Sequence, residues 1–216
     1  RAPVFTSDAG MANRIQICNM ALGHLGEIGS ISSIDPPEGS KYAEDCAQFY
    51  PMARDLAFAE APRGFHFNTT RAALALSGTP PSSWGYSYAW PSDVLHPLAV
   101  LFPEYVTDEM RSQPFVTETT GTRRYIYTDV EQAVLRYTFK QTDEATWTDA
   151  FAMAVSYRLA ALLAGPIIKG SKGIDVSQGM LRLFQDALQL AMAQDGNAQY
   201  SDEYRNFVSA GEMARR

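Results

Sequence analysis

Apolar residues follow a helical period near both ends of the chain and a period of two in its middle third. Over residues 15–25, and again over residues 43–57, they recur in steps of three or four. This spacing aligns side chains on one face of a helix. Ser40 supplies an N-cap before the second segment, and Asp35-Pro36-Pro37 imposes an extended break. The pattern predicts two amphipathic helices between residues 11 and 61.

Two further helices are predicted in the C-terminal third. Helical spacing of apolar residues begins at Thr148, and Gly165-Pro166 is expected to end or kink that helix. A basic, glycine-containing loop of residues 169–173 precedes a fourth helix at residues 175–193. Apolar residues lie on two sides of this last helix, which favours a contact with another subunit.

Between residues 80 and 140, β-branched and aromatic residues dominate short runs separated by turn residues. This composition is typical of antiparallel strands, of which we expect about five, with residues 124–128 and 133–139 forming a hairpin. The predicted fold is therefore α+β. It consists of a four-helix bundle (residues 11–79 and 141–195), a small antiparallel β domain (residues 80–140) inserted between helices 2 and 3, and an extended C-terminal arm (residues 196–216).

Aromatic side chains mark two candidate contact regions. Trp84, Tyr86, Tyr88 and Trp90 share one parity and so one face of a strand. They form either the core of the β domain or an exposed contact patch. The arm has no helical stripe and is either a frayed terminus or a docking segment that orders on a partner. Its apolar residues are Tyr200, Tyr204, Phe207 and Val208.

The composition limits the classes of function. The 216 residues are 46% hydrophobic and 19% charged, as in globular proteins, and the net charge of −6 argues against a face that grips DNA phosphates. Cys18 and Cys46 fall on the inward stripes of the first two helices and are expected to be buried free thiols. Residues 1–10 lack apolar periodicity, so we expect an N-terminal extension. The apolar run of residues 151–168 is expected to be too interrupted to span a bilayer, which favours a soluble protein.

Motifs for catalysis or cofactor binding are not found in the sequence. Residues 165–172 superficially resemble a phosphate loop, but the order of Lys and Ser is wrong. No G-x-S-x-G elbow occurs, and the three histidines have no triad context. Two cysteines and three scattered histidines make a zinc site improbable. We therefore expect a protein that is not an enzyme and holds no cofactor or metal. Arg54 and Asp55 are expected to form an ion pair at the rim of the bundle.

Three apolar motifs, in this order and spacing, resemble the head–tail adaptor proteins of short-tailed bacteriophages, of the tail tubular protein A type. The chain matches that family through Ile15-x-Ile17-Cys18-Asn19-x-Ala21-Leu22-x-x-Leu25-Gly26, Ser40-x-x-Ala43-x-x-Cys46-x-x-Phe49-Tyr50-Pro51-x-Ala53-Arg54-Asp55, and Leu159-Ala160-x-x-Leu163-Ala164-Gly165-Pro166-Ile167. The family's P-W-x-F element is replaced by residues 62–67, which lack the Trp. The resemblance covers roughly residues 11–193.

The resemblance implies a structural virion protein, assembled in the host cytoplasm and present at the capsid vertex. Such adaptors form a twelve-fold ring that joins the portal protein to the tail nozzle protein and lines the channel through which DNA passes without specific binding. It implies a portal-docking arm of Tyr200, Tyr204, Phe207, Val208, Arg215 and Arg216, and a nozzle-facing β domain bearing Trp84, Tyr86, Tyr88, Trp90, Tyr125 and Tyr127. It implies no membrane partner.

Two other functions stay open from the sequence. One is a virion-associated polysaccharide-cleaving enzyme that uses carboxylates of the β domain, such as Glu118 or Asp129. The other is a cellular α+β binding module unrelated to phages.

Overall fold

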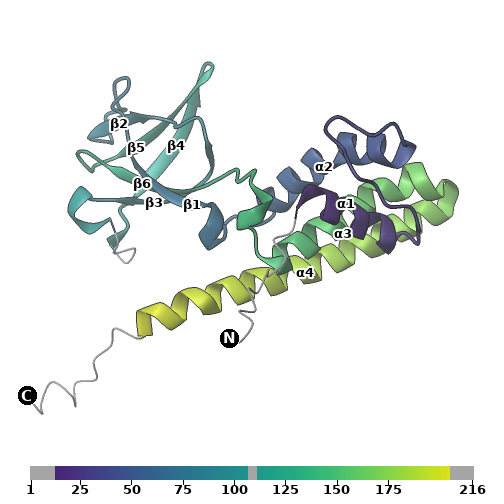
Figure 1. Ribbon diagram of the computed structural model, residues 1–216. Helices are drawn as coiled ribbons and strands as arrows, with labels where there is room; N and C mark the ends of the chain where they lie inside the picture. The colour runs from purple at the N-terminus through teal and green to yellow at the C-terminus, as the bar shows by residue number, and fades with distance from the viewer. Residues whose placement is uncertain (1–12, 107–110, 205–216) are drawn as a thin grey trace, which may run out of the picture. The chain divides into compact units, whose positions relative to one another are not determined.

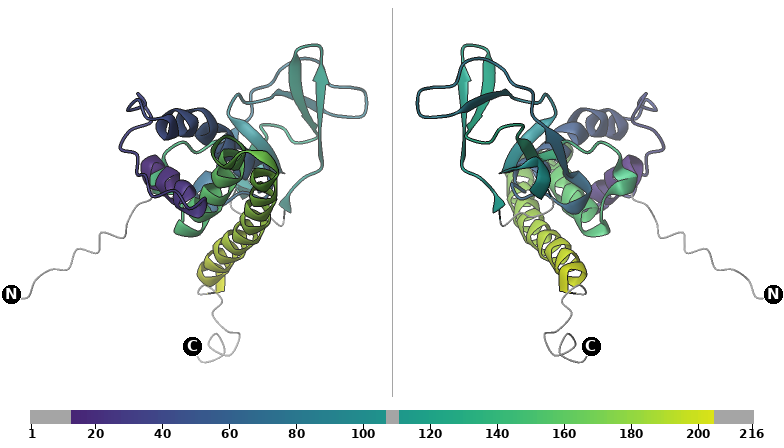
Figure 2. Two further views of the ribbon diagram at one scale, coloured as in Figure 1. Left: turned by 90° about the vertical axis from the view of Figure 1, so that its right-hand side faces the viewer. Right: turned by 90° about the vertical axis from the view of Figure 1, so that its left-hand side faces the viewer.

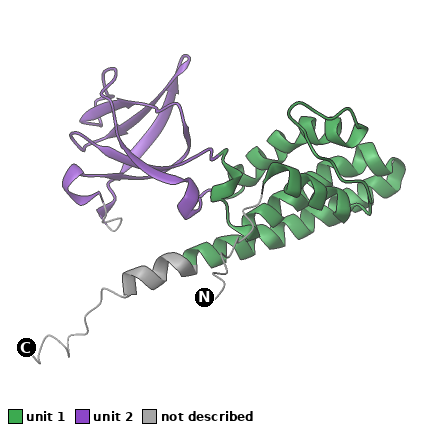
Figure 3. Cartoon of the chain, viewed as in Figure 1, with its two compact units in different colours: residues 1–61, 142–216 green, residues 62–141 purple. Residues whose placement is uncertain are grey.

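The chain forms a mixed α+β structure with four helices and two antiparallel sheets (Figure 1). The computed structural model describes residues 13–106 and 111–204, with side chains up to residue 196. The expected extension of residues 1–10 therefore lies outside the described part. Two compact units are present: a helical unit of residues up to 61 and from 142 onward, and a β unit of residues 62–141 (Figure 3).

Helix α3 (Asp149–Ile168) is the centre of the helical unit. Helices α1 (Arg14–His24), α2 (Lys41–Ala59) and α4 (Gly170–Tyr204) all pack against it, whereas α1 and α2 meet each other only briefly. Ten of the 20 residues of α3 are buried. The first turn of α3 contacts α2 through a cluster of three aromatic rings. The centre of the Phe151 ring lies 4.8 Å from that of Phe58 in α2 and 5.0 Å from that of Trp147.

Helices α3 and α4 form a tight antiparallel hairpin and run side by side (Figure 2). The sequence prediction placed a loop at residues 169–173 and an end or kink at Gly165-Pro166. Instead, α3 continues to Ile168, and α4 begins directly after Lys169, which takes a positive φ of 57°. Pro166 lies inside the last turn of α3, and the helix continues through it to Ile168.

Small residues allow this close approach. A Cβ on Gly173 would lie 3.0 Å from the carbonyl oxygen of Ala164, so α4 rests on the backbone of α3 at that point. One turn further on, the Ser177 hydroxyl donates to the carbonyl of Ala161 at 2.7 Å. The glycine that suggested a flexible loop in the sequence is therefore a packing residue.

The predicted C-terminal arm is only partly correct. The prediction treated residues 196–216 as extended, but α4 is 35 residues long and its helical backbone runs to Tyr204. Residues 205–216 lie outside the described part of the chain.

The described residues of the β unit form six strands: the five expected between residues 80 and 140, and one that precedes them. They are β1 (Thr69–Ala73), β2 (Tyr86–Ala89), β3 (Val94–Leu101), β4 (Phe115–Thr120), β5 (Arg123–Thr128) and β6 (Val134–Phe139). The two three-stranded sheets have the orders β1-β6-β3 and β2-β5-β4. The additional strand is β1, which pairs with β6, so residues 62–79 belong to the β unit and not to the helices as predicted.

The predicted hairpin between residues 124–128 and 133–139 is wrong. Those residues form β5 and β6, which lie in different sheets, and β5 pairs instead with β2 and β4. Both sheets contribute to one apolar core. Its buried members are Leu74, Tyr88, Val94, Val100, Ile126, Val130, Ala133, Leu135 and Tyr137.

Helix α3 is, within the described residues, the one helix long and apolar enough to cross a membrane by length and composition. The expectation that this segment is too interrupted for a span does not hold, since the helix is continuous. However, 56% of its most apolar window is buried inside the structure, as in the core helix of a folded domain.

Glycine substitutions on α4 test the hairpin contact. We expect Gly173→Ala to lower the free energy of unfolding by about 1–3 kcal/mol, because the new methyl group meets backbone that cannot move alone. Gly179→Ala is the matched control: nothing lies within 4 Å of its Cβ position. In a helix interior that change should stabilise by about 0.5–1 kcal/mol. Urea unfolding followed by far-UV circular dichroism measures both. Equal effects of the two substitutions would contradict the close contact.

Candidate functional site

The six aromatic residues suggested as a contact surface do not form one exposed patch. Tyr88 and Tyr127 are buried, at 0% and 6% exposure, while Trp84, Tyr86, Trp90 and Tyr125 are half-buried. Tyr86, Tyr88 and Trp90 pack into or against the core that the two sheets share. The core interpretation of the alternating aromatics is therefore the better one for these three residues.

Strand register explains why some of these aromatic side chains face the core and others do not. Tyr88 pairs with Ile126, so both face the core, and the Tyr88 hydroxyl donates to the carbonyl of Val130 at 2.7 Å. Tyr125 and Tyr127 flank Ile126 in β5 and therefore face the opposite side of the sheet, where their rings stack 6.2 Å apart. A nozzle contact that uses all six side chains at once would need both faces of this sheet.

The suggested arm residues are described only in part. Tyr200 and Tyr204 fall in the last turns of α4, where the helical backbone is described and the side chains are not. Phe207, Val208, Arg215 and Arg216 lie outside the described residues, so their role stays a prediction.

A second apolar stripe runs along α4 beside the stripe that packs on α3. Its members recur in alternating steps of four and three residues, the spacing of a helix–helix seam. They are Val176, Met180, Leu183, Ala187 and Leu190. Leu183 is 44% exposed and Leu190 is 56% exposed, although both are large and apolar. No described residue of the chain covers them fully.

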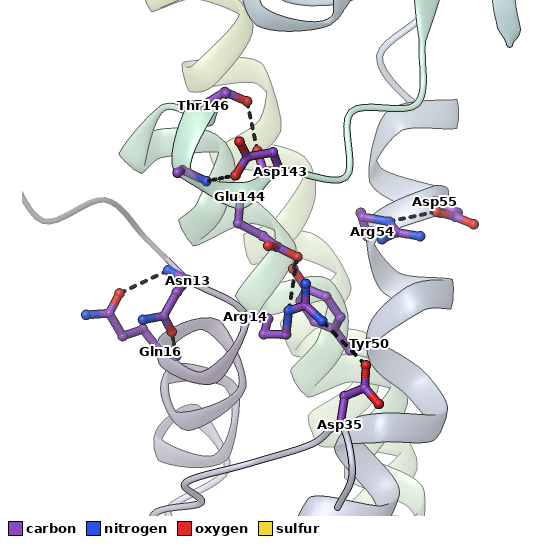
Figure 4. Close-up of polar contacts among 11 residues, drawn as sticks. Asn13, Arg14, Gln16, Asp35, Tyr50, Arg54, Asp55, Asp143, Glu144 and Thr146 are labelled. Carbon is purple, nitrogen blue, oxygen red and sulfur yellow. Dashed lines mark hydrogen bonds and ion pairs between the residues drawn. The ribbon is translucent and has the colours of Figure 1, made fainter.

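A buried carboxylate lies where α1, α2 and the start of α3 meet (Figure 4). Glu144 is 7% exposed and accepts a hydrogen bond from the Tyr50 hydroxyl at 2.8 Å. The guanidinium of Arg14 approaches the same oxygen at 3.8 Å and reaches Asp35 at 4.0 Å. Burial, followed by the charge of Glu144, raises the pKa of Tyr50 far above its ordinary value. This cluster compensates a buried charge and ties three segments together; sequence motifs gave no sign of it.

Capping and ion-pair contacts surround the cluster in Figure 4. Asn13 and Gln16 form a reciprocal capping box at the start of α1, with bonds of 3.0 and 2.9 Å. Arg54 pairs with Asp55 at 3.0 Å, which confirms the ion pair expected from the sequence. These contacts stabilise helix ends and the bundle rim.

The two cysteines are free and fully buried where α1 touches α2. The hydrogen bond to Cys46, together with burial, raises the pKa of the Cys18 thiol well above its ordinary value. Cys18 is therefore protonated at neutral pH and a poor nucleophile. The structure agrees with the expectation that both residues act as small core side chains.

His24 and Ser156 lie close together without forming a catalytic pair. The His24 Nε2 atom is 3.0 Å from the Ser156 hydroxyl oxygen, and that hydroxyl donates to the carbonyl of Met153 at 2.7 Å. The imidazole stacks on Tyr157, with centroids 4.3 Å apart. Because Ser156 is fully buried within α3, a substrate cannot reach its oxygen. Burial lowers the pKa of His24 from its ordinary value of 6.5.

The acids suggested for glycan cleavage are far apart. Glu118 lies opposite Tyr125 in the β4–β5 pairing, whereas Asp129 follows β5 and accepts a hydrogen bond from the Gly85 N–H at 2.8 Å. Four residues of extended strand separate the two positions, or about 13 Å. Paired carboxylates of glycosidases are about 5–9.5 Å apart. Within the described ranges, no group of His, Cys, Asp and Glu could hold a metal ion.

Comparison with known proteins does not identify the chain. No protein-family model matches it, and no curated protein sequence matches it. The likeness to phage adaptors therefore depends on the three motifs in the chain itself.

Substitutions at two tyrosines test the buried carboxylate. Tyr50→Phe removes the hydroxyl donor from Glu144 and should lower the free energy of unfolding by about 1–3 kcal/mol. Tyr137→Phe is the control, because its acceptor Asp93, at 2.9 Å, is exposed and can return to water. Tyr137→Phe should lower the free energy of unfolding by about 1 kcal/mol or less. Urea unfolding provides the comparison. A Tyr50→Phe variant as stable as wild type would show that Arg14 alone compensates the charge.

The lowered pKa of His24 predicts a pH dependence of stability. The unfolded chain binds a proton at this site more readily than the folded chain, so stability falls as pH drops below about 6.5 and through the folded-state pKa. We expect His24→Gln to flatten this part of the profile, as measured by thermal unfolding between neutral pH and pH about 5. Identical slopes for the wild type and His24→Gln would contradict the assignment.

Proposed function

We propose that the chain is a structural head-to-tail adaptor of a short-tailed phage: a subunit of a ring that joins portal to tail nozzle. In this proposal the helices form a four-helix bundle, interrupted between α2 and α3 by the β unit. The bundle lines the DNA channel, the β unit faces the nozzle, and the arm of residues 196–216, which includes the last turns of α4, docks on the portal. The observation that carries the proposal is the second apolar stripe of α4, because it offers a contact surface to another subunit.

The stripe supports assembly through simple energetics. Large apolar side chains on an isolated surface gain about 25 cal/mol for each Å² removed from water. Leu183 and Leu190 stand seven residues apart, so one neighbouring helix or groove can cover both. The buried stripe on the adjacent side of α4, which includes Phe184, Leu188 and Ala191, fixes the orientation of the helix.

The three motifs that resemble the phage adaptor family share one physical role, because each contributes buried side chains to the helical unit. This shared role is a second support for the proposal. Ile17, Cys18, Ala21 and Leu22 of the first motif are fully buried, and so are Ala43, Cys46 and Ala53 of the second. In the third motif the buried residues are Leu159, Ala160, Leu163 and Ala164. The buried members of the three motifs thus lie in the core of the helical unit, in which α1 and α2 pack on α3.

The negative net charge of the chain also suits a channel through which DNA must pass without being retained. A net charge of −6 disfavours retention of a polyanion.

Substitutions on α4 test the assembly role. We expect the full chain to form rings when mixed with the portal protein of the same virus, as seen by electron microscopy and native mass spectrometry. The double variant Leu183→Lys/Leu190→Lys should lose ring formation while keeping its helical circular dichroism, because two charges then occupy the seam. Ile174→Lys is the control: this residue is 61% exposed and lies about two and a half turns from Leu183, on the opposite side of the helix.

Two results would contradict the proposal. One is a wild-type chain that neither forms rings nor binds portal at any concentration tested. The other is a double variant that assembles as well as Ile174→Lys. A chain ending at residue 196 tests the docking arm separately: it should fold but fail to bind portal, and normal binding would remove the arm from the proposal.

A further inference from the structure

A shallow hollow of about 450 Å³ opens on the β unit beside the β4–β5 turn. Its floor contains Ala89 and Tyr125, which are opposite each other in β2 and β5. Ser77 forms one rim and is held there because its N–H donates to the carbonyl of Ser87 at 2.9 Å. Thr122 lies on the hairpin turn and also lines the hollow. The size falls within the range of small-molecule sites, about 300–1,000 Å³.

The chain crosses close above the floor at Gly78. This residue has a φ of +74°, and a Cβ there would lie 3.4 Å from the ring of Tyr125. A glycine is therefore suited to this position both by its backbone conformation and by the available space. The hollow is thus lined both by paired strands and by the connecting segments at Ser77 and Thr122.

Two arginines line the hollow, and the orientation of one is fixed. The guanidinium carbon of Arg124 lies 3.7 Å from the centre of the Trp90 ring, and the Trp90 N–H donates to the carbonyl of Arg124 at 3.1 Å. Stacking of this kind holds the planar fork in place before a ligand arrives, which lowers the entropic cost of binding. Trp90 is therefore a positioning residue for Arg124.

The positive charge of these arginines is not neutralised within the described part of the chain. No carboxylate there lies within 4 Å of the nitrogens of Arg123 or Arg124, and both residues are exposed. The one acid in β4 or β5 is Glu118, which lies diagonally across from Arg123 on the same face. Arg124 projects from the other face of β5, where it stacks on Trp90, so Glu118 lies beside Arg123 alone and the two arginines leave an excess of positive charge at the rim.

We propose that this hollow binds a small ligand whose carboxylate or phosphate is carried on a sugar-sized body. Guanidinium forks bind both anions through paired hydrogen bonds. The hydroxyls of Ser77 and Thr122 are suited to the hydroxyls of such a body, and Tyr125 offers it a half-buried ring. The site is independent of the adaptor role, since it uses residues of the β unit alone and no contact with another subunit.

Titration of the full-length, ¹⁵N-labelled chain tests the site. The probes are glucuronate and glucose 6-phosphate, with neutral glucose at the same ionic strength as the comparator. We expect saturable amide shifts confined to residues 77, 89–90 and 122–125 with at least one of the two anions. The anion that binds more tightly distinguishes a carboxylate ligand from a phosphate ligand. Glucose should produce no saturable shift.

Matched variants separate the site from general charge effects. Arg123→Ala should weaken binding of the preferred anion about fivefold or more, and Arg123→Lys should recover part of it, because the charge returns without the fork. Arg182→Ala removes an exposed arginine from α4 and should leave binding unchanged. The proposal is overturned by the absence of saturable shifts with both anions, by equal shifts with glucose, or by equal weakening in Arg123→Ala and Arg182→Ala.

Discussion

The burial of α3 by three other helices is the contact on which the helical unit depends. Helices α1, α2 and α4 all pack on it, while α1 and α2 touch each other only slightly, with Cys18 and Cys46 at that contact. The apolar composition of α3 follows from this position, because a helix covered on several sides cannot keep a polar stripe. The same composition makes α3 resemble a membrane span when it is considered without its neighbours.

Polar groups inside this unit are placed where segments from distant parts of the sequence meet. Glu144 accepts a hydrogen bond from Tyr50, and Ser177 donates to the backbone of α3. Each of these hydrogen bonds joins two residues that are far apart in the sequence. They specify which segments meet, whereas the apolar contacts supply most of the driving force. The unit therefore combines a general hydrophobic interface with a few specific polar contacts.

Periodicity was sufficient to predict the four helices but not their ends. The spacing from Thr148 onward and the N-cap at Ser40 are local signals, and both agree with the structure. The α3–α4 turn was missed because glycine at residue 173 has the same sequence signature in a loop and in a close helix contact. Strand order was also missed: β5 and β6 are neighbours in sequence, yet pairing depends on partners up to 69 residues away, such as Thr69 with Thr138.

The candidate sites likewise could not be found from local sequence signals, because they depend on tertiary contacts. Alternation correctly put Tyr86, Tyr88 and Trp90 on one side of a strand, but the identity of the covering residues is a tertiary property. Arg123 and Arg124 carry no motif, and only the fold brings them beside Ser77 and Trp90. The carboxylate at Glu144 was likewise indistinguishable in sequence from the exposed acids around it. The net charge of −6 requires no knowledge of the fold and argues against a DNA-gripping face, but it does not say where charges gather on the surface.

The order of the two units along the chain has a consequence for synthesis on the ribosome. The β unit is continuous in sequence, so all its strands are available once residue 141 has emerged. Helices α1 and α2 are made first, but the surface that covers them belongs to α3, which is translated more than 80 residues after α2 ends. At the usual elongation rates of about 5–20 residues per second, the apolar faces of α1 and α2 stay uncovered by α3 for several seconds. Helices α1 and α2 can thus complete their packing only after the β unit that follows them in the sequence can already pair its strands.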